Sequence, residues 1–170
     1  MHSLSYDRRS LLIGAGLVGA GLVGGGLLRG PAGLLGAANA AGTLAATPSM
    51  RGGSNNYRPG APLVDNLGEG FIVSGTVRKA GAGEPLGGLR IQIWAATGRG
   101  GEREPSNHGS VLTAADGSFR LEMSQIVPNF GQPHAHLAYD DGAFETVFLR
   151  PVMGSAADTS VQAHFVLAAA

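Results

Sequence analysis

The sequence contains no cysteine. This absence excludes disulfide bonds, thiol nucleophiles and thiolate metal ligands, so any metal must be held by histidine, tyrosine, carboxylate or water. Charged residues are scarce, at 14% of 170 residues, and the formal net charge is zero. Because no run of basic residues interleaved with aromatic residues occurs, we expect no nucleic-acid partner.

The signatures of several common enzyme classes are also missing. The chain has no Gly-x-Ser-x-Gly elbow, no Walker loop, no dinucleotide fingerprint and no zinc-protease motif. Hydrolase and nucleotide-dependent functions therefore have no support in the sequence. No long helical pattern follows residue 40 either.

The first forty residues have the pattern of an export signal. Arg8 and Arg9 stand directly before Leu11–Leu28, an uncharged stretch with seven glycines. This segment resembles a twin-arginine signal peptide, and Ala38-Asn39-Ala40 offers a small-x-small cleavage site. A transmembrane anchor is the alternative, which the glycines and Arg29 disfavour. We expect export to the periplasm or the extracellular space, with no membrane contact beyond the signal.

The rest of the chain divides into a lead-in and one domain. Residues 41–68 are rich in Gly, Pro, Ser and Asn without an apolar period, which predicts a flexible linker. Residues 69–170 break into short apolar or alternating runs separated by turn residues. The expected strands are 70–78, 89–95, 110–113, 118–123, 134–139, 146–149 and 160–167. Seven short strands predict an all-β domain, a β-sandwich of two antiparallel sheets.

The most informative motif is a pair of histidines, His134 and His136, in the segment Pro133-His134-Ala135-His136. Because side chains alternate along a strand, both imidazoles should point to the same face. Neutral imidazole is the commonest protein ligand for transition metals, so the pair predicts a metal site. Two solvent-facing polar residues on a half-buried sheet are the alternative.

Two stretches of the domain resemble the intradiol ring-cleavage dioxygenase family. The first runs from Gly75-Thr76-Val77 through Pro85-Leu86-Gly87 to Ile93-Trp94, an opening that transthyretin-like modules share. The second joins the strand at 112–119, a proline turn at 128–130 and the histidine pair. The resemblance implies a prealbumin-like sandwich, non-haem ferric iron and a small, catechol-like aromatic substrate.

The same resemblance implies that two tyrosines and two histidines hold the iron. His134 and His136 match the two histidines. Gly100 stands where the first tyrosine is implied, in the loop after the tryptophan strand, and Phe130 stands where the second is implied. The two phenolate ligands are therefore not found at the matching positions.

Three further residues are expected to contact the substrate. Trp94 ends an alternating strand and is expected to form a wall of the core or of a cleft. Phe130 and Gln132 flank the histidine motif, and Gln132 replaces an arginine that the family has there. No catalytic residue can be assigned from the sequence.

A third metal ligand must come from elsewhere in the chain. His108 lies in a polar loop next to the strand that feeds the proline turn, and we expect a set of His108, His134 and His136, against a solvated loop histidine. His164 shares a strand face with polar Gln162 and is expected to point outward. Tyr139, three residues after His136, should face away from both imidazoles.

These observations favour an exported relative of the intradiol dioxygenases that uses non-haem iron to oxygenate a catechol-like aromatic. Two alternatives stay open. One is a divergent member whose His-only site holds copper, zinc or ferrous iron. The other is a non-catalytic β-sandwich binding module that kept the fold. The sequence also leaves open whether the protein forms a homo-oligomer.

Overall fold

The computed structural model describes residues 43–170, so the predicted export signal at residues 1–40 lies outside the described part. Within that part the protein is all-β, with one short 3-10 helix at Pro105–Asn107 and no α-helix. No helix among these residues is long and apolar enough to cross a membrane. The strands are β1 (Asn66–Leu67), β2 (Gly70–Lys79), β3 (Arg90–Ala95), β4 (His108–Leu112), β5 (Ser118–Ser124), β6 (Ala135–Tyr139), β7 (Val147–Leu149) and β8 (Ser160–Leu167).

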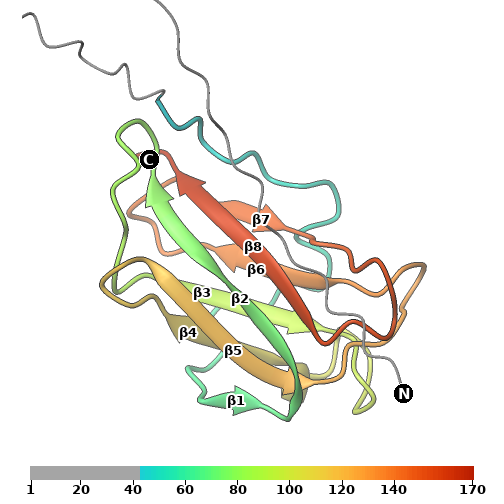
Figure 1. Ribbon diagram of the computed structural model, residues 1–170. Coiled ribbons are helices and arrows are strands. Elements are labelled where there is room, and N and C mark those ends of the chain that lie inside the picture. The colour runs from blue at the N-terminus through green and yellow to red at the C-terminus, as the bar shows by residue number, and fades with distance from the viewer. Residues whose placement is uncertain (1–42) are drawn as a thin grey trace, which may run out of the picture. The chain divides into compact units, whose positions relative to one another are not determined.

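The strands form two four-stranded sheets that pack face to face (Figure 1). The first sheet has the order β1-β5-β2-β8 and the second the order β4-β3-β6-β7. The predicted β-sandwich is therefore confirmed. The expectation of wholly antiparallel sheets is corrected, because β1 pairs with β5 and β8 pairs with β2 in parallel. β8 follows β7 of the other sheet, so it enters the first sheet by a crossover and runs in the direction of β2.

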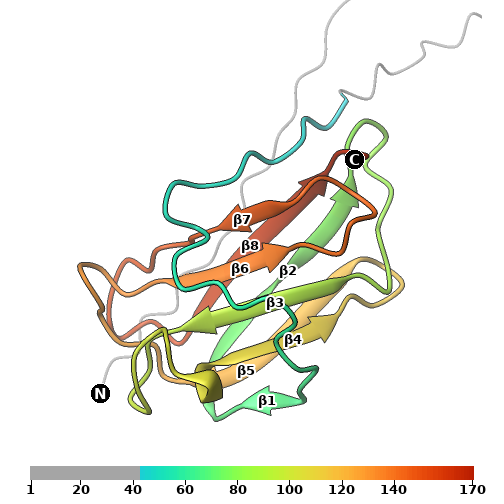
Figure 2. The same cartoon turned by 180° about the vertical axis from the view of Figure 1, so that it is seen from behind.

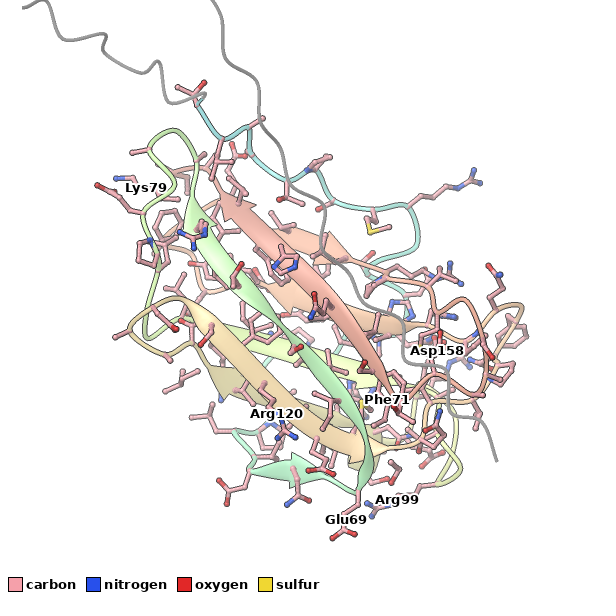
Figure 3. The ribbon with its side chains drawn as sticks, viewed as in Figure 1. Glu69, Phe71, Lys79, Arg99, Arg120 and Asp158 are labelled. Atoms are coloured by element: carbon pink, nitrogen blue, oxygen red, sulfur yellow. The ribbon has the colours of Figure 1, made fainter. Side chains whose placement is uncertain are left out.

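Alternation along the strands puts one face of each sheet into the core. Phe71 of β2 lies between the sheets, whereas Arg120 of β5 is exposed on the outer face of the first sheet (Figure 3). Ile93 of β3 and Leu137 of β6 face the core from the second sheet. Each such apolar side chain contributes about 1.5–3 kcal/mol on burial. Tyr139 of β6 also lies in this core and thus faces away from the histidine pair, as predicted.

The outer face of the second sheet carries aromatic and polar side chains. Trp94 of β3 lies opposite His108 of β4 on one side and His136 of β6 on the other. Further along β3, Gln92 lies opposite Ser110. All five side chains are buried although they point away from the core. Another segment of the chain must therefore cover this face.

That segment is the strap, defined here as residues 49–64, which crosses the outer face of the second sheet (Figure 2). At the edge strand β7, Met50 N–H donates to Phe148 O at 2.7 Å. At β4, Val64 N–H donates to Ser110 O at 3.0 Å. The strap was predicted as part of a flexible linker, and the structure corrects this for the described residues. Its attachments use main-chain groups, which the composition of a segment does not reveal.

Candidate metal centre

Three buried side chains converge where β3 ends and β6 begins. Glu102, His134 and His136 each offer one ligand atom, and these atoms lie within 4.8 Å of one another. Oε1 of Glu102 lies 3.0 Å from Nε2 of His134, and Oε2 lies 3.4 Å from Nε2 of His136. A carboxylate and two imidazoles directed at one point are a candidate metal centre.

The start of β6 positions the two histidines. His134 precedes the strand and His136 is its second residue, so the pleat places both rings on the outer face of the sheet. Their ring centroids lie 4.9 Å apart in an edge-to-face arrangement. The shared face expected from the His-x-His spacing is therefore confirmed.

Backbone carbonyls fix the tautomers of both rings. Nδ1 of His134 donates to Gln132 O at 2.8 Å, and Nδ1 of His136 donates to Gly53 O at 2.9 Å. Since a carbonyl oxygen can only accept, Nδ1 carries the proton, and in the neutral ring Nε2 has a free lone pair. Burial lowers the pKa of His136 below its usual value of 6.5, which keeps this ring neutral at neutral pH.

Nε2 of His136 is buried and has no hydrogen-bond partner within residues 43–170. Leaving such an atom unpaired costs about 1–3 kcal/mol. A metal ion bound there would satisfy it. The lone pair of His136 is therefore an independent sign that the three side chains are built to hold a cation.

The carboxylate of Glu102 is held by two side-chain amides. Asn129 Nδ2 donates to Oε1 at 2.9 Å, and Asn56 Nδ2 donates to Oε2 at 2.8 Å. Burial by itself raises the pKa of Glu102, but the amide hydrogen bonds and the nearby histidines outweigh it, and the pKa falls below its usual value of 4.5. The carboxylate is therefore ionised at neutral pH and ready to bind a metal.

The separations of the ligand atoms fit one divalent transition-metal ion. Two ligand atoms that each lie about 2.1 Å from an ion are about 3.0 Å apart at a right angle and about 3.4 Å apart at a tetrahedral angle. The separation of each histidine Nε2 from its nearer Glu102 oxygen matches one of these values, and the three ligand atoms lie within 4.8 Å of one another. Two histidines and one carboxylate are the ligands of many non-haem ferrous sites and of some catalytic zinc sites. The residues present therefore fit a metal ion.

The third ligand predicted from the sequence, His108, does not join this group. The indole of Trp94 stands between His108 and His136, stacked on both rings at centroid distances of 5.8 and 5.1 Å. Nε2 of His108 instead donates to the backbone carbonyl of Glu102 at 2.6 Å. The predicted three-histidine set is thus corrected. The strand register places Trp94 between the two histidines, and Glu102 offers the third candidate ligand atom.

The three predicted substrate contacts lie in different surroundings. Phe130 is 98% exposed and lines a cavity of about 330 Å³ that also reaches Glu102 and His134. Trp94 is buried beneath the strap, where a substrate cannot reach it. Gln132 contributes its backbone carbonyl to His134. Phe130 thus lies beside the candidate metal centre, and the buried position of Trp94 corrects the expectation that this residue contacts a substrate.

Two arginines line the same cavity. Arg103 follows Glu102 in the chain, and Arg150 follows β7, with its Nη2 atom 3.3 Å from Nδ1 of His134. Neither arginine forms an ion pair with a carboxylate among residues 43–170. Guanidinium groups without an acidic partner favour an anionic ligand.

Tyr57 of the strap closes the outer face above Trp94. Their ring centroids lie 5.6 Å apart, and the hydroxyl of Tyr57 donates to Asp140 at 2.8 Å and accepts from Gln92 at 2.6 Å. Burial and the Asp140 carboxylate raise the pKa of Tyr57 to about 12. The phenol therefore stays protonated and covers the indole rather than serving as a phenolate ligand.

His164, the other histidine considered from the sequence, lies on the outer face of the first sheet. It is exposed, and its Nδ1 atom lies 2.9 Å from the Thr76 hydroxyl. The outward orientation expected from strand parity is therefore confirmed.

Sequence reasoning missed Glu102, although a signal was present. The resemblance implied a ligand in the loop after Trp94 and assigned Gly100 to that place. Glu102 follows two residues later in the same loop, which also contains Glu104. Both glutamates of this loop are possible carboxylate ligands, and only the structure distinguishes Glu102 from Glu104. The supporting amides of Asn56 and Asn129 come from distant loops and carry no comparable signal.

No protein family and no curated protein sequence matches the chain. Solved structures with a similar fold include 3-chlorocatechol 1,2-dioxygenase from Rhodococcus opacus 1CP, with a TM-score of 0.54 and 16% identity over 74% of this chain and 73% of that one. Hydroxyquinol 1,2-dioxygenase from Pseudomonas putida DLL-E4 has a TM-score of 0.54 and 16% identity over 75% and 68%.

A third similar structure is the dioxygenase domain of a dioxygenase carbohydrate-binding protein fusion from Streptomyces sp. SirexAA-E. Its TM-score is 0.56, with 22% identity over 74% of this chain and 99% of that one. At these identities the likeness is one of fold. The chain therefore has the intradiol dioxygenase-like fold that its sequence predicted.

Proposed function

We propose that the protein is a non-haem iron enzyme that oxygenates a catechol-like aromatic, with Glu102, His134 and His136 as its metal ligands. The strongest support is the convergence of these three ligand atoms, one of them the unpartnered Nε2 of His136, on an intradiol dioxygenase-like fold. Two histidines and one carboxylate favour ferrous iron over the ferric iron that the sequence resemblance implied. The His-only site considered from the sequence is replaced by a site with a carboxylate.

Glu102, His134 and His136 would hold the iron, which would coordinate the dihydroxy-aromatic and supply the redox chemistry of oxygenation. The residues of the chain orient the metal ligands and select the substrate. Asn129 keeps the Glu102 carboxylate oriented and ionised. Phe130 offers an exposed ring face at the cavity, against which a substrate ring can pack.

The cavity also favours a substrate that carries an anionic group. Arg103 and Arg150 place two positive charges around a cavity whose volume suits a single substituted ring. A carboxylate on the ring can accept charge-assisted hydrogen bonds from a guanidinium. The proposed substrate class is therefore a dihydroxy-aromatic acid rather than an unsubstituted catechol.

The experiment that tests this function combines metal analysis with oxygen uptake. Protein purified without oxygen and supplied with ferrous iron should retain about one iron per chain and consume oxygen with 3,4-dihydroxybenzoate. Stoichiometric zinc without oxygen uptake would instead favour a zinc enzyme, since zinc accepts the same ligands. Protein that retains no metal at all would contradict both functions and leave a binding module.

Replacing Arg150 with glutamine should change the substrate preference. A hydrogen bond to a charged group contributes about 1.5–3 kcal/mol, so kcat/KM for 3,4-dihydroxybenzoate should fall about 10- to 100-fold while that for catechol changes little. Arg120→Gln is the matched control, because Arg120 lies exposed on the other sheet and pairs with Glu122. Equal losses for both substrates in Arg150→Gln would refute the role in selection.

We also propose that the protein works outside the cytoplasm. The support is the twin-arginine pattern of Arg8 and Arg9 before an uncharged, glycine-rich stretch. Cell fractionation of a variant with both arginines changed to lysine tests it, since the variant should stay in the cytoplasm.

A further inference from the structure

The strap makes three contacts with the metal centre and its surroundings within four residues. Gly53 O accepts from Nδ1 of His136 at 2.9 Å. Asn55 O accepts from the indole Nε1 of Trp94, also at 2.9 Å. The side chain of the next residue, Asn56, donates to Oε2 of Glu102 at 2.8 Å. Two of the three candidate ligands are thus held by one short segment that precedes the first strand.

We propose that the strap is a positioning element of the metal centre and that strap docking and metal binding stabilise one another. This inference rests on the proposed function only in that Glu102, His134 and His136 hold a metal. It does not depend on the identity of the metal or on the reaction.

Gly53 lets the strap approach the sheet closely enough to reach His136. A Cβ atom at this position would lie 2.9 Å from the backbone carbon and oxygen of Phe148, which is closer than real Cβ atoms come to backbone. An alanine there would force the strap away from β7. The Gly53 carbonyl would then move away from Nδ1 of His136, and the tautomer that frees Nε2 would lose its fixed partner.

Asn56 joins the Glu102 ligand to the cavity. Its Nδ2 group holds Oε2 of Glu102, while its Oδ1 atom accepts from Nε of Arg103 at 3.0 Å. The backbone of Asn56 has a φ of 57°, in the left-handed region that few residues other than glycine and asparagine adopt. Such a conformation persists where surrounding contacts hold it, and it is frequent at functional sites.

The coupling follows from thermodynamic linkage. Groups that orient metal ligands from outside typically change metal affinity by 10- to 100-fold. If docking of the strap raises metal affinity by a given factor, then metal binding must raise the docking equilibrium by the same factor. The strap should therefore open more often in the metal-free protein than in the metal-loaded one.

The chain contains its own reporter for this coupling. Trp94 is the single tryptophan, and it contacts both partners: its ring stacks on His136 at 5.1 Å, and its Nε1 donates to the strap at Asn55. Its fluorescence should therefore respond to metal binding and to release of the strap.

The test is a titration of the full chain with Zn²⁺, which has no redox chemistry, followed by Trp94 fluorescence. Gly53→Ala displaces the strap without removing a donor atom, and Asn56→Gly removes the side chain while keeping the left-handed backbone accessible. Both variants should bind Zn²⁺ about 10- to 100-fold more weakly. Ser54→Ala is the matched control, because Ser54 is exposed in the same strap, and it should bind within about twofold of the original.

Hydrogen exchange supplies the reciprocal measurement. Zn²⁺ should slow exchange of the strap amides that bond to the sheet, which are Met50 N–H on β7 and Val64 N–H on β4, in the original protein and less so in Gly53→Ala. Exchange in β2 and β5 shows whether each variant is folded. The coupling would be overturned if Gly53→Ala and Asn56→Gly are folded and bind Zn²⁺ with unchanged affinity. It would also be overturned if Zn²⁺ does not change the exchange rates of the strap amides. If the original chain and His136→Ala bind Zn²⁺ equally weakly, the proposed metal site falls as well.

Discussion

His136→Ala is expected to abolish stoichiometric metal binding and oxygen uptake together. The substitution removes one of the three candidate ligand atoms, a buried nitrogen that has no hydrogen-bond partner within residues 43–170. Because groups outside the ligand set already change affinity by 10- to 100-fold, loss of a ligand should weaken metal binding by more than about 100-fold. Elemental analysis after dialysis and an oxygen electrode measure the two effects.

The same variant should keep its fold. The imidazole of His136 lies outside the core between the sheets. Its removal also removes an unpaired buried nitrogen. Glu102→Gln is a second test, since it keeps the size of the side chain and loses the charge. His164→Ala is the matched control, because His164 is exposed on the first sheet. A His136→Ala protein that retains one metal per chain would exclude His136 as a ligand.

Gly75→Ala is expected to destabilise the fold more than any substitution on the outer face of the same strand. Gly75 of β2 lies between Phe119 of β5 and Ala163 of β8. A Cβ atom there would overlap the carbonyl oxygen of Ala163 and lie 2.7 Å from Cζ of Phe119. The backbones of two paired strands would have to separate, so the free energy of unfolding should fall by at least about 3 kcal/mol.

Thermal unfolding measures this effect. A loss of that size corresponds to a Tm lower by about 10 °C or more for a domain of this length. Ser74→Ala provides the control, because Ser74 is the neighbouring residue in β2 and lies on the other face of the sheet. Its Tm should stay close to that of the original protein. Equal stability of Gly75→Ala and Ser74→Ala would mean that the strands accommodate the added methyl group.

Gly75 also shows why the Gly75-Thr76-Val77 segment has a glycine at this position. It is the glycine of the Gly75-Thr76-Val77 segment that contributed to the resemblance, and in the structure it is a point where β8 leaves no room for a Cβ atom on β2. The strands themselves could be predicted because each carries its own pattern of alternating or apolar residues. The ends of the seven predicted strands differ from the observed ends by at most two residues, whereas β1 at Asn66–Leu67 lies in the predicted linker and was missed.

For the candidate metal site, the sequence predicted the orientation of the two histidines but not the third ligand. The shared face of His134 and His136 follows from their spacing, which is a local property of an extended strand. The third ligand could not be fixed in this way, because the distance from Glu102 to the histidines depends on how the loop between β3 and β4 folds over the end of β6. Strand register also decided against His108 by placing Trp94 in between.

By itself, the sequence determined the all-β sandwich, the positions of seven of the eight described strands and the common direction of the two imidazoles, since all of these follow from periodicity along the chain. The tertiary structure alone decided that Glu102 joins the two histidines in the candidate metal centre, that Arg103 and Arg150 line the adjacent cavity, and that residues 49–64 form a strap instead of a linker. The physical reason is that these contacts join distant segments and often use backbone carbonyls and amides. Every residue but proline carries both groups, so no composition or spacing can indicate which of them will meet.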